Sequence, residues 1–201
     1  MLGRDTRERS HSEAGWIEQG SIVLWAALAA LVLVRLRPPT VGSIAGAIVC
    51  LGGAAREADL HKRFTEYSVL KVGFYLKDEY PLDQRALFGA FFIVLLTSLI
   101  TLGIAMLQAA RGAGKPTPAW LKVGAIGMAL LVMSKLMDRA PGMLKDLNGH
   151  VLDERWSGPL KLLEEGYELA LPVVFGVAVW LYGGVRQSRE SGGVRAAVGA
   201  N

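Results

Sequence analysis

Five apolar runs alternate with segments that hold almost all of the charged residues. As helices, these runs cover about residues 17–36, 41–60, 86–110, 119–137 and 166–185. A bilayer core about 30 Å thick needs roughly 20 apolar residues of helix, and only the second run is short, because Arg56 interrupts it. The pattern predicts an all-α, polytopic transmembrane helix bundle of about five spans.

The bundle, residues 16–185, is expected to lie between a polar N-terminal arm, residues 1–15, and a flexible tail, residues 186–201. The 201 residues suffice for one domain, and 52% of them are hydrophobic. The first span ends in Arg35 and Arg37 rather than at a small-residue cleavage site, so we expect no removable signal peptide. Cys50, the only cysteine, cannot form a disulfide within the chain.

Charge differs between alternate gaps. The gaps 35–37 and 111–122 and the tail from residue 186 hold 8 basic residues and 1 acidic residue, a net charge of +7. The remaining polar segments hold 14 basic and 17 acidic residues, a net charge of −3, which completes the total of +4. Basic segments poor in acid are typical of the cytoplasmic face, so the pattern favours an outer N-terminus and a cytoplasmic C-terminus. The bare number of basic residues, 14 against 8, points the other way.

Small residues form a stripe along the second span. Gly42 and Gly46 are four residues apart, and Cys50 and Gly53 continue the stripe at helical spacing. Small residues let helix backbones approach closely in lipid. The stripe favours a packing face inside the bundle, and it leaves open a homo- or hetero-oligomer through Gly42, Gly46 and Gly53.

Five spans would bring the end of the second span, the end of the fourth and the start of the fifth to one membrane face. Ionisable side chains near the membrane usually face protein or a wet cavity. The sequence therefore predicts a pocket for an ion or a polar headgroup with Glu57, His61 and Glu168 at its centre. The residues expected around this centre are Arg56, Asp138, Arg139 and Glu165.

The same residues allow other interpretations. Glu57 with His61 and Glu164 with Glu168 have i, i+4 spacing, so the four could hold a divalent metal, although the sequence predicts no cofactor firmly. Glu168, four residues before the helix-distorting Pro172, could instead accept and release a proton. Pairs such as Lys135 with Asp138 could also form a self-neutralised collar that only anchors the helices.

Several functional classes are disfavoured. The chain has no Gly-rich phosphate loop, no GxSxG motif and no histidine pair within its spans that could hold a haem. Basic residues beside spans are explained by topology, so no nucleic-acid partner is expected. The leading hypothesis is that the protein is a non-enzymatic membrane protein with a pocket for an ion or a headgroup. The alternatives are a non-catalytic scaffold or assembly partner and a metal-dependent membrane hydrolase.

Three segments carry a resemblance to other proteins: READLHKRFTEYSVLKVGFYL at 56–76, MDRAPGML at 137–144 and EEGYELALP at 164–172. With these segments the chain resembles a set of uncharacterised bacterial multi-pass inner-membrane proteins, over its second to fifth spans. The resemblance implies a bacterial cytoplasmic (inner) membrane and implies no particular activity.

Overall fold

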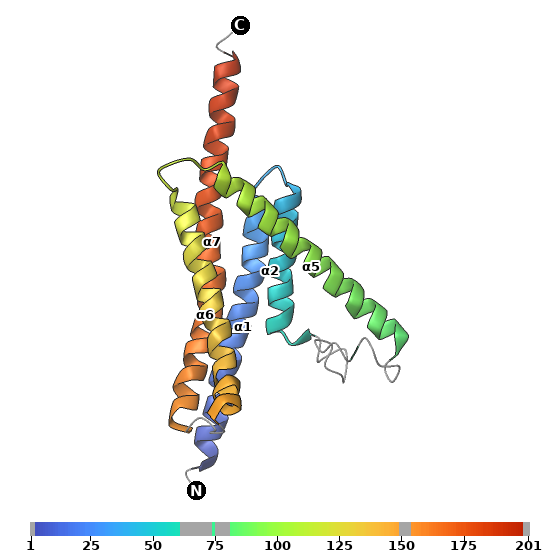
Figure 1. Cartoon of the computed structure of the whole chain (residues 1–201), viewed down its shortest axis with the longest axis vertical. Coiled ribbons are helices and arrows are strands. Elements are labelled where there is room, and N and C mark those ends of the chain that lie inside the picture. Colours follow the sequence, from blue (N-terminus) through green and yellow to red (C-terminus); the bar gives the residue numbers. More distant parts are fainter. Residues whose placement is uncertain (1–2, 61–73, 75–80, 149–153, 199–201) are drawn as a thin grey trace. The chain divides into compact units, whose positions relative to one another are not determined.

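The computed structural model describes residues 3–60, 74, 81–148 and 154–198, and this part of the chain is all-helical (Figure 1). The all-α fold predicted from the apolar runs is therefore confirmed. The described helices are α1 (Gly3–Arg35), α2 (Val41–Glu57), α5 (Leu82–Arg111), α6 (Ala119–Asn148) and α7 (Glu154–Val198).

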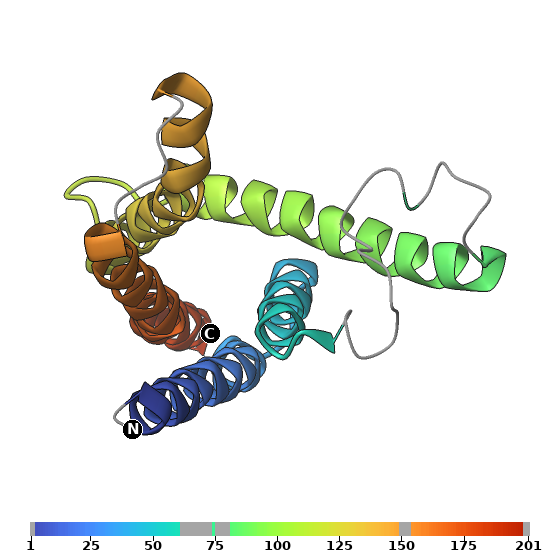
Figure 2. The same cartoon turned by 90° about the horizontal axis from the view of Figure 1, so that it is seen from below.

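The chain divides into two compact units, each described by itself. The α6–α7 unit contains Met1–Leu24 and Lys115–Asn201, and the α2–α5 unit contains Trp25–Gly114. Helix α1 therefore contributes its first part to one unit and its last part to the other. Each unit is built on an antiparallel helix pair (Figures 1 and 2).

Within the described residues, three helices are long and apolar enough to cross a membrane: Leu82–Arg111, Ala119–Met137 and Glu165–Ser188. The protein is therefore a membrane protein. Two shorter helical segments correspond to the other predicted spans, namely Gln19–Arg35 of α1 and the 17 residues of α2. At a rise of 1.5 Å per residue, 17 residues reach about 26 Å, slightly less than the hydrocarbon core.

Helix α5 gives the clearest sign of a lipid environment. Ser98 is its only buried residue, and large apolar side chains on all its faces are exposed, among them Leu87, Phe91, Ile93 and Ile100. A helix that is apolar all round needs apolar surroundings on every side, as a membrane provides.

Several helix ends differ from those expected. Helix α2 begins after Thr40, whose side chain accepts a hydrogen bond from the Ser43 amide while Ser43 Oγ accepts one from the Thr40 amide. The helix ends at Glu57 rather than at residue 60, because Asp59 adopts the left-handed backbone conformation with a φ of 47°. His61 lies outside the described residues, so the expectation that Glu57 and His61 share a helical face at i, i+4 spacing stays a prediction.

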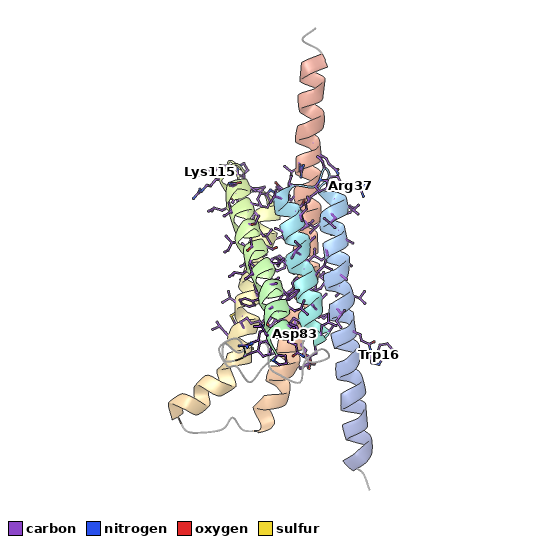
Figure 3. The ribbon with its side chains drawn as sticks, turned by 90° about the vertical axis from the view of Figure 1, so that its right-hand side faces the viewer. Trp16, Arg37, Asp83 and Lys115 are labelled. Carbon is purple, nitrogen blue, oxygen red and sulfur yellow. The ribbon has the colours of Figure 1, made fainter. Side chains whose placement is uncertain are left out.

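Three helices extend further than the sequence predicts, one past a proline and two into the polar terminal segments. Helix α6 continues past Pro141 to Asn148, beyond the predicted end of the span at residue 137, and its last part runs in a different direction from its start (Figure 3). A proline can bend a helix without ending it. Helix α1 already begins at Gly3, and α7 continues to Val198 through the segment expected to be a flexible tail.

The glycine stripe of α2 packs against α1 and α5 of its own unit. A Cβ at Gly42 would lie 2.8 Å from Ala105 Cβ, and one at Gly46 would lie 3.5 Å from Leu102 Cδ1. A Cβ at Gly53 would lie 2.9 Å from the Trp25 ring. The stripe therefore serves helix packing within the chain, and a partner helix could use it only by displacing α1 or α5.

Helices α6 and α7 meet along a seam with a seven-residue repeat. Trp120 stacks edge-on against Tyr182 with ring centroids 5.0 Å apart, and a Cβ at Gly127 would lie 2.7 Å from the Phe175 ring. Seven residues after Gly127, α6 carries Ser134. Seven residues before Phe175, α7 carries Glu168. This seven-residue step is the geometry of coiled-coil packing.

Candidate functional site

A polar contact in the described part of the α6–α7 unit joins its two helices. Lys135 Nζ donates a hydrogen bond to Glu168 Oε1 at 3.4 Å, and the same contact is an ion pair. The Lys135 side chain is 41% exposed and that of Glu168 is 17% exposed. The ammonium group is thus the accessible member of the pair, and the carboxylate lies deeper in the seam.

The position of this pair follows from the helix register. Glu168 occupies the seam position one repeat before Phe175, and Lys135 follows the seam residue Ser134, so its side chain reaches Glu168 from the edge. Charged residues beside a coiled-coil seam commonly pair across it in this way. Lys135 lies in the last turn of the candidate span Ala119–Met137, and Glu168 lies in the first turn of Glu165–Ser188. The pair therefore marks one end of both spans.

The same unit contains two buried serine hydroxyl groups. Ser134 has 0% exposed surface and Ser21 has 2%, and neither Oγ has a hydrogen-bond partner within the described part of the chain. Ser134 precedes Lys135, and Ser21 follows Gly20, where an added Cβ would lie 3.6 Å from Leu169 Cδ1. Buried hydroxyls normally have a partner, so each of these groups is a polar atom whose partner lies outside the described part of the chain.

The other part of the predicted pocket lies in the α2–α5 unit. Arg56 forms an ion pair with Glu57 at 3.7 Å, in which the Glu57 side chain is 12% exposed. Glu165 and Glu168 belong to the α6–α7 unit. The joining of Glu57 and Glu168 in one pocket therefore stays a prediction.

His61 lies outside the described residues, as do the side chains of Asp138, Arg139 and Glu164. Among the residues that the structure describes, no group of three or more His, Cys, Asp or Glu side chains could hold a metal ion. Lys135 also places a positive charge 3.4 Å from Glu168 Oε1, so this carboxylate already has a counter-charge. A divalent metal at Glu57, His61, Glu164 and Glu168 stays a prediction that these contacts do not support.

Sequence reasoning identified Glu168 and Lys135 as ionisable residues at span ends, but it paired Lys135 with Asp138 on its own helix. It also missed Ser134. The signal for Ser134 was present, because Trp120, Gly127 and Ser134 follow one another at seven-residue intervals. A serine that continues a seam of aromatic and small residues is expected to face the partner helix.

Comparison with models of protein families found no match. Comparisons with curated proteins and with solved structures likewise found none. The functional argument therefore depends on the residues of this chain and on their contacts.

Proposed function

We propose that this protein is a multi-pass protein of the bacterial inner membrane that binds a polar lipid headgroup between α6 and α7. The observation that carries the proposal is the Lys135–Glu168 ion pair at the end of two candidate spans. The pair presents an accessible ammonium group beside a partly buried carboxylate. The buried Ser134 hydroxyl, which has no partner in the described part of the chain, lies next to it in the sequence.

A headgroup explains these features better than a metal ion does. Lys135 supplies a cation to Glu168, so the carboxylate has a counter-charge without any metal. Lysine is also a good partner for phosphate, which it binds as a point charge. The span ends lie at the depth where lipid phosphates meet the protein. A phospholipid headgroup is therefore the ligand that this contact favours.

The proposal predicts that the purified protein retains phospholipid. In native mass spectrometry from a maltoside detergent, the wild-type protein should carry about one phospholipid per chain. The double variant Lys135→Gln/Glu168→Gln should lose this adduct, because it removes both charges and keeps the size of the side chains similar. Lys122→Gln, near the other end of α6, is the matched control and should retain the lipid. Equal lipid retention by all three proteins would refute headgroup binding at this pair.

The proposed topology has five spans, with the N-terminus outside and the C-terminus in the cytoplasm. The unequal charge of the alternate segments and the apolar segments of α1 and α2 support it. Within the α2–α5 unit, Arg37 and Asp83 lie at opposite ends (Figure 3). Five spans place the 37–40 turn and the 112–117 turn on the cytoplasmic side.

Cysteine labelling tests this topology. In a Cys50→Ala background, Pro39→Cys and Gly114→Cys should react with a membrane-impermeant maleimide only after the cytoplasmic side is opened. Ser10→Cys should react in intact spheroplasts. If α1 and α2 do not cross the membrane, Pro39→Cys will instead react together with Ser10→Cys, and the protein will have three spans.

A second candidate is a scaffold or assembly role, which the exposed apolar faces of α5 favour. A partner helix could cover part of this surface in place of lipid. If the protein acts in this way, it should co-purify from its native membrane with a stoichiometric partner, and the partner should be lost when Phe91 and Ile100 are replaced by alanine. Purification without such a partner would leave lipid as the neighbour of α5.

A further inference from the structure

We propose that the headgroup bound between α6 and α7 carries both a phosphate and a primary ammonium group, as a phosphoethanolamine headgroup does. This inference rests on the proposed function and names the class of lipid. Three observations support it: the arrangement of the two charges, the buried Ser134 hydroxyl and the charge of the surrounding segment.

The two charges of the site are complementary to those of a zwitterionic headgroup. Lys135 Nζ lies 3.4 Å from Glu168 Oε1, so a positive and a negative group stand side by side at the span ends. The more exposed ammonium group of Lys135 can receive the lipid phosphate, which it binds as a point charge. The deeper carboxylate can then accept hydrogen bonds from the ammonium group of the lipid, since a carboxylate accepts several at once.

The Ser134 hydroxyl distinguishes a primary from a quaternary ammonium group. Ser134 is fully buried, continues the seven-residue spacing of Trp120 and Gly127 along α6, and has no partner for its Oγ within the described residues. A primary ammonium group has three N–H donors and can serve both Ser134 and Glu168, whereas a trimethylammonium group has none.

The net charge of the sequence from Lys135 to Glu168 disfavours an anionic headgroup. Residues 135–168 contain seven acidic and five basic residues, a net charge of −2. A lipid with a net negative charge would be repelled by this segment, whereas a zwitterionic lipid brings a positive charge of its own. Local charge therefore favours a zwitterionic lipid, and Ser134 selects the one with N–H donors.

The test is a lipid competition on the full-length protein. The delipidated protein in maltoside is mixed with equal amounts of phosphatidylethanolamine, phosphatidylcholine and phosphatidylglycerol with the same acyl chains, and the adducts are counted by native mass spectrometry. We expect phosphatidylethanolamine adducts to exceed each of the others about tenfold, which corresponds to a difference of about 1.4 kcal/mol in binding free energy. Equal binding of phosphatidylcholine, or a preference for phosphatidylglycerol, would overturn the inference and leave headgroup binding intact. Failure of all three lipids to bind would overturn the proposed function itself.

Variants locate the source of this preference. Glu168→Gln should reduce the ratio of phosphatidylethanolamine to phosphatidylcholine adducts, because the amide is a weaker acceptor for an ammonium group. Ser134→Ala, which removes only one oxygen atom and is expected to fold, should also reduce the ratio. Lys122→Gln, on the same helix and away from the seam end, should leave it unchanged. An unaltered ratio in both Glu168→Gln and Ser134→Ala would contradict the proposed arrangement of the headgroup.

Discussion

Replacing Gly42 by alanine should destabilise the protein by forcing α2 and α5 apart. A Cβ at this position would lie 2.8 Å from Ala105 Cβ, and a methyl group fixed to the backbone cannot rotate away. Helices α2 and α5 would have to separate along a contact that depends on close approach in lipid. We expect a loss of about 1–3 kcal/mol, the usual cost of overpacking. Thermal unfolding in detergent measures this loss.

Two further variants separate this effect from the general influence of alanine on a helix. Alanine normally stabilises a helix relative to glycine by about 1 kcal/mol, so Gly103→Ala on α5, where an added Cβ meets nothing within 4 Å, should be neutral or stabilising. Gly42→Ala/Ala105→Gly moves the methyl group from one helix to the other and should recover most of the lost stability. If Gly42→Ala is as stable as Gly103→Ala, the close contact between α2 and α5 does not exist.

Removing one member of the Lys135–Glu168 pair should cost more stability than removing both. In Lys135→Leu, the carboxylate of Glu168, whose side chain is only 17% exposed, loses a charged partner at the end of two spans. Interhelical polar contacts in membranes contribute about 0.6 kcal/mol on average and up to about 1.7 kcal/mol. Because Lys135 is 41% exposed and partly screened, we expect a loss of about 1 kcal/mol.

The double variant Lys135→Leu/Glu168→Leu should unfold at a higher temperature than Lys135→Leu, because the partly buried carboxylate that has lost the Lys135 ammonium group is removed as well. The coupling between the two sites is obtained from the unfolding midpoints of the wild-type protein, the two single variants and the double variant. Additive effects of the single variants would show that the two side chains do not interact, and the site would then lose its main contact.

The sequence predicted the helices well because their signals are local. Apolar runs of sufficient length indicated α5 and the candidate spans in α6 and α7, and the small residues from Gly42 to Gly53 indicated a packing face. The left-handed backbone at Asp59 was not predicted, because a non-glycine residue in that conformation gives no sequence signal that is specific enough. The continuation of α6 past Pro141 was not predicted either, since proline can end a helix or only bend it.

In the candidate site, too, the positions of residues within their helices were predicted, whereas the contacts between helices were not. Composition placed Lys135 and Glu168 at span ends, because charged residues mark the limits of an apolar run. The choice of partner depends on the register between α6 and α7, which the contacts at Trp120 and Gly127 define. Glu57 belongs to the other unit, so sequence pattern alone joined it to Glu168. The arrangement of one helix against another is information that helical periodicity does not contain.

The most direct test of headgroup binding is the distance between Lys135 Nζ and lipid phosphorus in solid-state NMR. Lysine labelled with ¹⁵N is measured in the protein prepared in a phosphorus-free maltoside with one equivalent of phosphatidylethanolamine, so that only a bound lipid contributes ³¹P. The Lys135 signal, assigned by its absence in Lys135→Gln, should show dephasing by ³¹P, and this dephasing should be lost in Glu168→Gln/Ser134→Ala. A Lys135 signal unaffected by ³¹P in the wild-type protein would contradict headgroup binding at the α6–α7 seam.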